Sequence, residues 1–127
     1  MALVLDSSAV SYLARRTPAT LALITALRDR GVWPPLVPSP VLIECLTGDG
    51  SRDAATHRLL RSVNILEAVP VGLARRAAHL RTEAHRGSAI DALVVATSEP
   101  GGTVLTGDAR DIRALAQHAQ DVGVEAI

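Results

Sequence analysis

Five acidic residues stand at positions from which their carboxylates can hold a metal ion. Carboxylate oxygens are the ligands that Mg²⁺ prefers, and because the ion keeps several waters, a few acids around it are enough. A bound Mg²⁺ or Mn²⁺ ion can generate a nucleophile from water and neutralise the charge of a phosphate. The residue types therefore predict a hydrolytic metal site with ligands scattered along the chain, namely Asp6, Glu44, Asp91, Asp108 and Asp111.

Each of the four aspartates also has a purely structural explanation. Asp6 follows an apolar run and can accept hydrogen bonds in a turn. Asp91 comes three residues after Ser88, which is the spacing of a capping box with Asp in place of Glu. Asp108 and Asp111 have the same spacing. Taken singly, these residues are explained as well by helix starts as by a metal, and only their combination favours a metal site.

Glu44 is harder to explain structurally. It lies within the apolar run 41–46, which we expect to form a buried helix. An isolated buried carboxylate is costly unless it is paired or binds a metal. We therefore expect Glu44 to face the metal site, with an ion pair to an arginine as the alternative. Asp91 likewise precedes an apolar run, residues 92–96, so its carboxylate is expected near the edge of the core.

The other residues of catalytic type form no recognised pattern. Cys45 is the only cysteine, so it cannot form an internal disulfide, and with no histidine near it in sequence we expect a structural thiol. The four histidines show no spacing typical of zinc ligands and are expected to be structural or solvated; they are His57, His79, His85 and His118.

The formal net charge is zero, but all thirteen basic residues are arginine. If the five acids bind a metal, eight acids remain against thirteen arginines, and the rest of the surface carries about +5. Arginine pairs at 15–16, 58–61 and 75–76 can hold phosphates, although a solvated helix face explains any single arginine as well. One Trp, one Tyr and no Phe argue against binding of single strands by aromatic stacking.

Short apolar strands alternate with helices, which predicts parallel strands covered on both faces. The expected fold is a three-layer α/β/α sandwich with a short, mainly parallel central sheet, in one domain over residues 1–127. Strands are expected at 3–5, 36–37, 65–69, 103–106 and, at the edge, 122–127. Helices are expected at 8–15, 18–29, 41–46, 51–62, 71–85, 88–98 and 108–119.

The expected sheet accounts for two of the acids. In such sheets ligands bind at the carboxyl ends of the strands. Asp6 and Asp108 both lie just past the ends of apolar strands, so they share a crevice if those strands are neighbours. No apolar stretch approaches the roughly 20 residues that span a bilayer, and the first residues run directly into a strand, so we expect a cytoplasmic protein.

Four segments resemble the motifs of the PIN-domain ribonucleases, and in particular the VapC-type toxins of bacterial toxin–antitoxin pairs. Residues 3–9 contain an apolar strand followed by Asp and a hydroxyl residue, and residues 41–48 contain an apolar run with Glu. In residues 88–96 an Asp opens an apolar helix, and in residues 105–112 a Thr is followed by two acids. The resemblance covers essentially the whole chain, with the motifs in the same order. Gly107 is a departure, because a larger polar residue often stands at this place.

The resemblance implies a Mg²⁺ site, in which Mn²⁺ can substitute, with acids oriented by neighbouring hydroxyl groups. Family members differ in which of the last two acids completes the site, so Asp108 and Asp111 both remain candidates for that place. The implied acids are Asp6, Glu44, Asp91 and Asp108, with Asp111 as the further metal ligand, and the implied orienting hydroxyls are those of Ser7 and Thr106.

The implied activity is endoribonucleolytic hydrolysis of RNA phosphodiester bonds by a toxin. The implied partners are a second copy of the chain in a homodimer and a VapB-type antitoxin whose tail occupies the active-site groove. The alternative is a catalytically silent PIN-like module that regulates or binds an antitoxin, which the acids at all four motif positions argue against.

Three other classes of α/β protein are excluded by single residues. A receiver domain needs a Lys near its last strand, and the chain contains none. A haloacid-dehalogenase-like phosphatase needs a second Asp two residues after the first, where Ser8 stands instead. A Walker or Rossmann nucleotide-binding domain needs a glycine-rich loop after the first strand, and residues 6–8 supply none.

Overall fold

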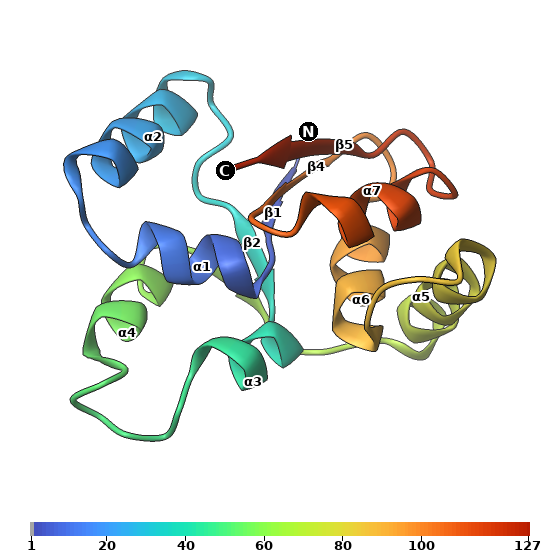
Figure 1. Cartoon of the computed structure of the whole chain (residues 1–127), viewed down its shortest axis with the longest axis horizontal. Helices are drawn as coiled ribbons and strands as arrows, with labels where there is room; N and C mark the ends of the chain where they lie inside the picture. The colour runs from blue at the N-terminus through green and yellow to red at the C-terminus, as the bar shows by residue number, and fades with distance from the viewer. Residues whose placement is uncertain (1) are drawn as a thin grey trace.

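The computed structural model describes residues 2–127, in which five strands form a single parallel sheet. The strand order is β3-β2-β1-β4-β5, and each neighbouring pair is parallel (Figure 1). This confirms the predicted α/β sandwich. The strands are β1 (Leu3–Leu5), β2 (Leu36–Pro38), β3 (Asn64–Leu66), β4 (Thr103–Thr106) and β5 (Gly123–Ala126).

Helices lie on both sides of this sheet. Figure 1 shows α1, α2 and α4 on one side and α5, α6 and α7 on the other. The helices are α1 (Ser7–Leu13), α2 (Pro18–Asp29), α3 (Leu42–Cys45), α4 (Ala54–Leu60), α5 (Val71–Ala84), α6 (Ala89–Ser98) and α7 (Ala109–Ala116), with a 3-10 turn, η1 (Ser39–Val41), before α3. Within residues 2–127, none of the helices has the length and apolar character that a membrane span requires.

The central strand β1 is buried along its whole length, because helices cover both faces of the sheet around it. Its neighbour β4 pairs with it in the register Leu3↔Thr103, Val4↔Val104 and Leu5↔Leu105. The residues that follow Leu5 and Leu105 are therefore brought side by side at the carboxyl edge of the sheet. The sheet thus places Asp6 next to Thr106 and close to Asp108.

Helix starts and helix ends both differ from the prediction by at most three residues. Thr17 caps α2 with Pro18 in its first turn, and Ser88 and Asp91 form the predicted capping box of α6. The fourth helix begins at Ala54 rather than at residue 51, and the last helix ends at Ala116 rather than at residue 119. Strand β3 occupies Asn64–Leu66, shorter than predicted, and β5 confirms the predicted edge strand.

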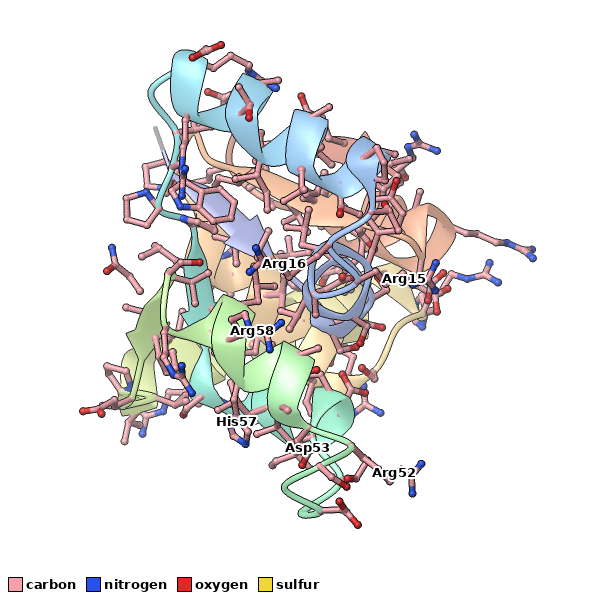
Figure 2. The ribbon with its side chains drawn as sticks, turned by 90° about the vertical axis from the view of Figure 1, so that its left-hand side faces the viewer. Arg15, Arg16, Arg52, Asp53, His57 and Arg58 are labelled. Carbon is pink, nitrogen blue, oxygen red and sulfur yellow. The ribbon has the colours of Figure 1, made fainter. Side chains whose placement is uncertain are left out.

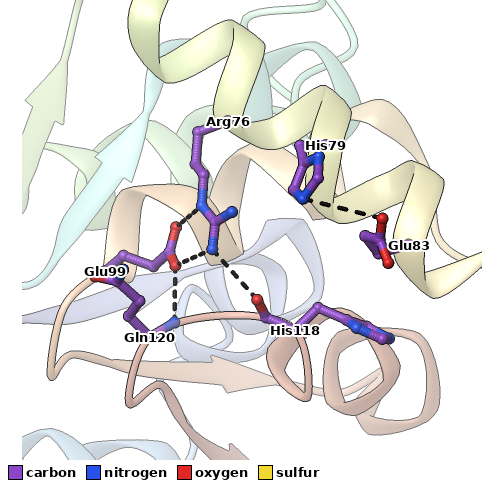
Figure 3. Close-up of polar contacts among 6 residues, drawn as sticks. All are labelled: Arg76, His79, Glu83, Glu99, His118 and Gln120. Atoms are coloured by element: carbon purple, nitrogen blue, oxygen red, sulfur yellow. Dashed lines mark hydrogen bonds and ion pairs between the residues drawn. The ribbon is translucent and has the colours of Figure 1, made fainter.

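A largely buried ion pair joins the helices of one layer to the edge of the sheet. Arg76 on α5 donates to both carboxylate oxygens of Glu99, at 2.8 Å each, and the backbone N–H of Gln120 donates to Glu99 at 2.7 Å (Figure 3). The Glu99 side chain is only 9% exposed. These contacts connect α5, the end of α6 and the segment before β5. In contrast, His79 and Glu83 form only an exposed pair along α5, at 4.0 Å.

The pKa of Glu99 is lowered, chiefly by its hydrogen bonds from Arg76, although burial acts in the opposite direction. We expect Glu99→Gln to reduce the free energy of unfolding by about 1–3 kcal/mol at pH 7, because it weakens hydrogen bonds to a charged group that water hardly reaches. Because the folded pKa lies below the unfolded value, this contribution is present above the unfolded pKa and is lost as pH falls through the folded pKa.

Urea unfolding of the wild type and the variant at pH 7 and pH 3 measures this contribution. Glu125→Gln is the matched control, because Glu125 pairs with Arg30 on the surface, where removal costs under about 0.5 kcal/mol. Equal losses for the two variants, or a loss for Glu99→Gln that grows as pH falls, would contradict this account.

Candidate metal centre

Asp6 is held rigidly at the end of β1. The carboxylate is 4% exposed, and its Oδ1 accepts hydrogen bonds from Ser8 Oγ at 2.6 Å and from the backbone N–H of Ala9 at 2.9 Å. Its Oδ2 accepts a hydrogen bond from the hydroxyl of Thr106. Asp6 thus caps α1 while its position is fixed from β4.

A second hydroxyl ties the turn after β4 to the start of α1. Ser8 Oγ accepts a hydrogen bond from the backbone N–H of Gly107 at 2.7 Å while it donates to Asp6. A side-chain Cβ at position 107 would lie 3.3 Å from Ser8 Cβ and Oγ, so glycine permits this close approach. The contact that we predicted for Ser7 is therefore made by Ser8, whereas Thr106 contacts Asp6 as its predicted orienting role requires.

Three further aspartates meet beside this pair of strands. Carboxylate oxygens of Asp91, Asp108 and Asp111 lie within 4.8 Å of one another. Asp91 comes from the first turn of α6, and the other two come from the start of α7. Asp108 precedes α7, but its side chain makes no capping hydrogen bond, so the structural explanation for this acid fails. Its backbone N–H instead donates to Thr106 Oγ1 at 2.8 Å, which fixes its place relative to Asp6.

Asp91 differs from Asp108 in that it has a structural role as well. Its Oδ2 accepts a hydrogen bond from the backbone N–H of Ser88 at 3.1 Å, which completes the capping box of α6. Its pKa is raised, first by burial and then by the negative charges of Asp108 and Asp6, while the hydrogen bonds from Ser88 oppose the shift. A hard cation would relieve this repulsion, so the residues present fit a divalent ion such as Mg²⁺.

Asp111 differs from Asp108 in having a cationic partner. Arg86, in the connection between α5 and α6, donates from Nε to Asp111 Oδ1 at 2.6 Å. One oxygen of Asp111 is therefore already engaged by a guanidinium. This pairing favours Asp108 over Asp111 as the acid that completes the site opposite Asp6.

Glu44 is not gathered with the aspartates, and our argument from its burial is wrong. The run 41–46 forms η1 and the four-residue helix α3 rather than a longer buried helix. A helix of one turn presents one side to the core, so Leu42 and Cys45 are partly buried, whereas Ile43 is 77% exposed and Glu44 is exposed. A role of Glu44 toward a metal stays a prediction that rests on the motif alone.

The thiol of Cys45, next to Glu44, has a raised pKa. Burial is the largest cause, and the negative charges of Asp53 and Glu44 add to it. A raised pKa reduces the thiolate fraction at neutral pH, and the thiolate is the nucleophile. This agrees with the structural role that we predicted for the residue.

Asp53 organises the loop that follows Glu44, and the sequence analysis missed it. Its carboxylate is 3% exposed and accepts hydrogen bonds from the backbone N–H and the hydroxyl of Thr47 and from the N–H of Gly48 at 2.8 Å. We expected a helix start at Ser51, yet Asp53 precedes α4 and bonds backward to the loop. The detectable signal was an Asp six residues after a Thr-Gly turn.

The pKa of Asp53 is lowered: burial alone would raise it, but the hydrogen bonds from Thr47 and Gly48 outweigh that effect. We expect Asp53→Asn to lower the free energy of unfolding by about 1–3 kcal/mol at pH 7, because buried N–H donors lose a charged acceptor. The folded pKa is below the unfolded value, so this contribution is present above the unfolded pKa and disappears as pH falls through the folded pKa.

Thermal and urea unfolding measure the effect, with Asp49→Asn as the control in the same loop. Asp49 is exposed and its carboxylate accepts hydrogen bonds only from Ser51 and Arg52, so its loss should cost less than that of Asp53. A smaller cost for Asp53→Asn than for Asp49→Asn would show that the loop is held by other contacts.

Comparison with known proteins agrees with this fold. The family model of the PIN domain matches residues 3–117, and the chain belongs to that family, whose members are generally nucleases. A search of curated proteins gave no match. Among solved structures, the crystal structure of FitAcB from Neisseria gonorrhoeae is similar, with a TM-score of 0.62 and 20% sequence identity over 96% of this chain and 95% of that one. At this identity the similarity concerns the fold.

Proposed function

We propose that the protein is a Mg²⁺- or Mn²⁺-dependent endoribonuclease that acts as the toxin of a toxin–antitoxin pair. The observation that carries the proposal is the group of carboxylate oxygens from Asp91, Asp108 and Asp111 within 4.8 Å of one another, beside the neighbouring strands that hold Asp6. Membership of the PIN family supports hydrolytic cleavage, and the resemblance of the motifs to those of VapC-type toxins supports RNA as the substrate.

In this mechanism the protein side chains hold the metal ion and orient the carboxylates that bind it. Asp6, fixed by Thr106 and Ser8, lies at the carboxyl edge of the sheet, near enough for its charge to act on Asp91, and we assign it the role of holding the metal together with Asp91 and Asp108. A divalent ion bound there would supply an activated water and neutralise charge on the phosphate under attack. Glu44 is exposed and does not belong to this group of aspartates. We assign it one of two roles: it helps to hold the metal, or it accepts a proton from the attacking water. The products carry a 5′-phosphate and a 3′-hydroxyl.

The proposal includes two partners that the motif resemblance implies. One is a second copy of the chain, in a homodimer. The other is a VapB-type antitoxin whose tail enters the active-site groove. An arginine from that tail would meet the group of aspartates that includes Asp111, which Arg86 of this chain already contacts.

The proposal predicts that cleavage and metal binding depend on the same side chains. Asp6→Asn should abolish cleavage of RNA in Mn²⁺, and EDTA should do the same for the wild type. Thr106→Val removes the hydroxyl that contacts both Asp6 and the backbone of Asp108, so Mn²⁺ affinity should fall about 10–100-fold. Calorimetric titration with Mn²⁺ and a gel assay on RNA are the measurements.

Thr97→Val is the matched control, because its hydroxyl donates only to the carbonyl of Leu93 within α6. It should leave Mn²⁺ affinity and cleavage near the wild-type values. Cleavage that persists in EDTA or in Asp6→Asn would overturn the proposed mechanism. A wild type that neither binds Mn²⁺ nor cuts RNA would identify the catalytically silent module.

A further prediction separates Asp108 from Asp111 as the acid that completes the site. Asp108→Asn should weaken Mn²⁺ binding more than Asp111→Asn, because Arg86 already occupies one oxygen of Asp111. Calorimetry of the two variants under identical conditions provides the comparison. The reverse order would assign the ligand to Asp111 and imply that Arg86 moves away when the metal binds.

A further inference from the structure

A pocket of about 300 Å³ opens at the end of α1 that lies farthest from the acids. Helix α1 begins directly after Asp6 and ends at Leu13, whose side chain lines the pocket together with residues of α2 and α4. Its wall carries three arginines, Arg16, Arg28 and Arg58, and none of the described residues that line it is acidic. Most of the other lining residues are apolar, so the pocket is an apolar hollow whose charged groups are all basic.

The guanidinium groups at this pocket have no carboxylate partner. Within residues 2–127, none of the three arginines lies within 4.0 Å of an acid; of the thirteen arginines, only Arg30, Arg76 and Arg86 form ion pairs there.

The three guanidinium groups of the pocket differ in their surroundings. Figure 2 shows Arg16 and Arg58 on one face of the molecule, between α2 and α4. Arg28 lies over the ring of Trp33, with its guanidinium carbon 5.7 Å from the ring centre, so one face of the ring is occupied by a cation of the protein. The polar groups left to meet a ligand are the guanidinium donors.

We propose that this pocket binds the sugar–phosphate backbone of the RNA a few nucleotides from the cleaved bond, an inference that rests on the proposed nuclease function. Planar guanidinium groups bind phosphate oxygens in pairs, and a charge-complementary pocket of this size accommodates a phosphate with its sugar. Because Arg28 occupies one face of the Trp33 ring, stacking of a base there competes with a protein cation, which favours contact with the backbone.

The geometry of α1 sets the spacing between the two sites. Its seven residues span about 10 Å, since a helix rises 1.5 Å per residue. Stacked nucleotides rise about 3.4 Å each, so the pocket lies on the order of three nucleotides from the acids along one strand. A single RNA strand is long enough to reach from the acids to the pocket, and because the proposed substrate is RNA we take RNA rather than an acidic protein segment as the occupant.

The test measures binding without cleavage. Fluorescence anisotropy with a labelled 12-nucleotide polyuridylate, in EDTA and at several salt concentrations, gives the Kd and its salt dependence. The variant Arg16→Gln/Arg58→Gln should raise the Kd about tenfold or more and reduce the salt slope by about 1.4, because each lost phosphate contact removes about 0.7. The variant Arg16→Lys/Arg58→Lys keeps the charge and should retain the wild-type slope with a smaller loss of affinity.

The matched control is Arg75→Gln/Arg113→Gln, which removes the same charge from exposed positions on α5 and α7 outside the pocket. Equal effects of the two glutamine variants on Kd and slope would overturn the inference. If the double pocket variant does not fold, as judged by circular dichroism, the single variants replace it, each with an expected slope change of about 0.7.

The remaining outcomes separate this inference from the proposed function. If the wild-type protein cuts RNA in Mn²⁺ and the pocket variants bind RNA as well as the wild type, the nuclease function is supported and the RNA-binding role of the pocket is contradicted. If the protein binds polyuridylate through Arg16 and Arg58 but cuts no RNA, the RNA-binding role of the pocket is supported and the nuclease function is contradicted. A labelled hexaglutamate peptide that binds through these arginines, with no RNA bound, would assign the pocket to an acidic protein partner.

Discussion

The hydroxyl of Thr106 joins the two strands on which the acidic site is built. It donates to the buried carboxylate of Asp6 at the end of β1 and accepts from the backbone N–H of Asp108 after β4. Both contacts depend on the parallel register that aligns Leu5 with Leu105. Because a slip of one residue would reverse the side of the sheet to which these side chains point, packing of the apolar strands in the core also sets the geometry of the acids.

The aspartates at this edge fall into two kinds. Asp6 and Asp91 each use one oxygen to satisfy backbone N–H groups at a helix start, so they contribute to folding as well as to the site. Asp108 and Asp111 contribute no cap, and they belong to a cluster in which burial, and to a lesser extent like charges, raise the pKa of Asp91. Such a concentration of charge is destabilising in itself and is typical of sites that are completed by a ligand.

The fold and most of the site follow from patterns that local physics enforces. Alternating apolar strands and helices predicted the parallel sheet, and capping chemistry correctly placed the start of α6 at Ser88. The burial of Glu44 was mispredicted because an apolar run does not reveal how short a helix will be or which side it turns to solvent. The backward contacts of Asp53 and the use of Ser8 in place of Ser7 depend on loop geometry, which a one-dimensional pattern does not contain.

Because of the capping box of α6, loss of the carboxylate at position 91 affects folding, whereas its loss at position 108 does not. A substitution that removes the Asp91 carboxylate also removes a hydrogen bond at the start of a helix packed through the core. Loss of the Asp108 carboxylate removes no capping hydrogen bond from α7. Among naturally inactivated copies, changes at 108 should persist as folded proteins that still occupy their partners, whereas changes at 91 should be cleared more readily by proteases.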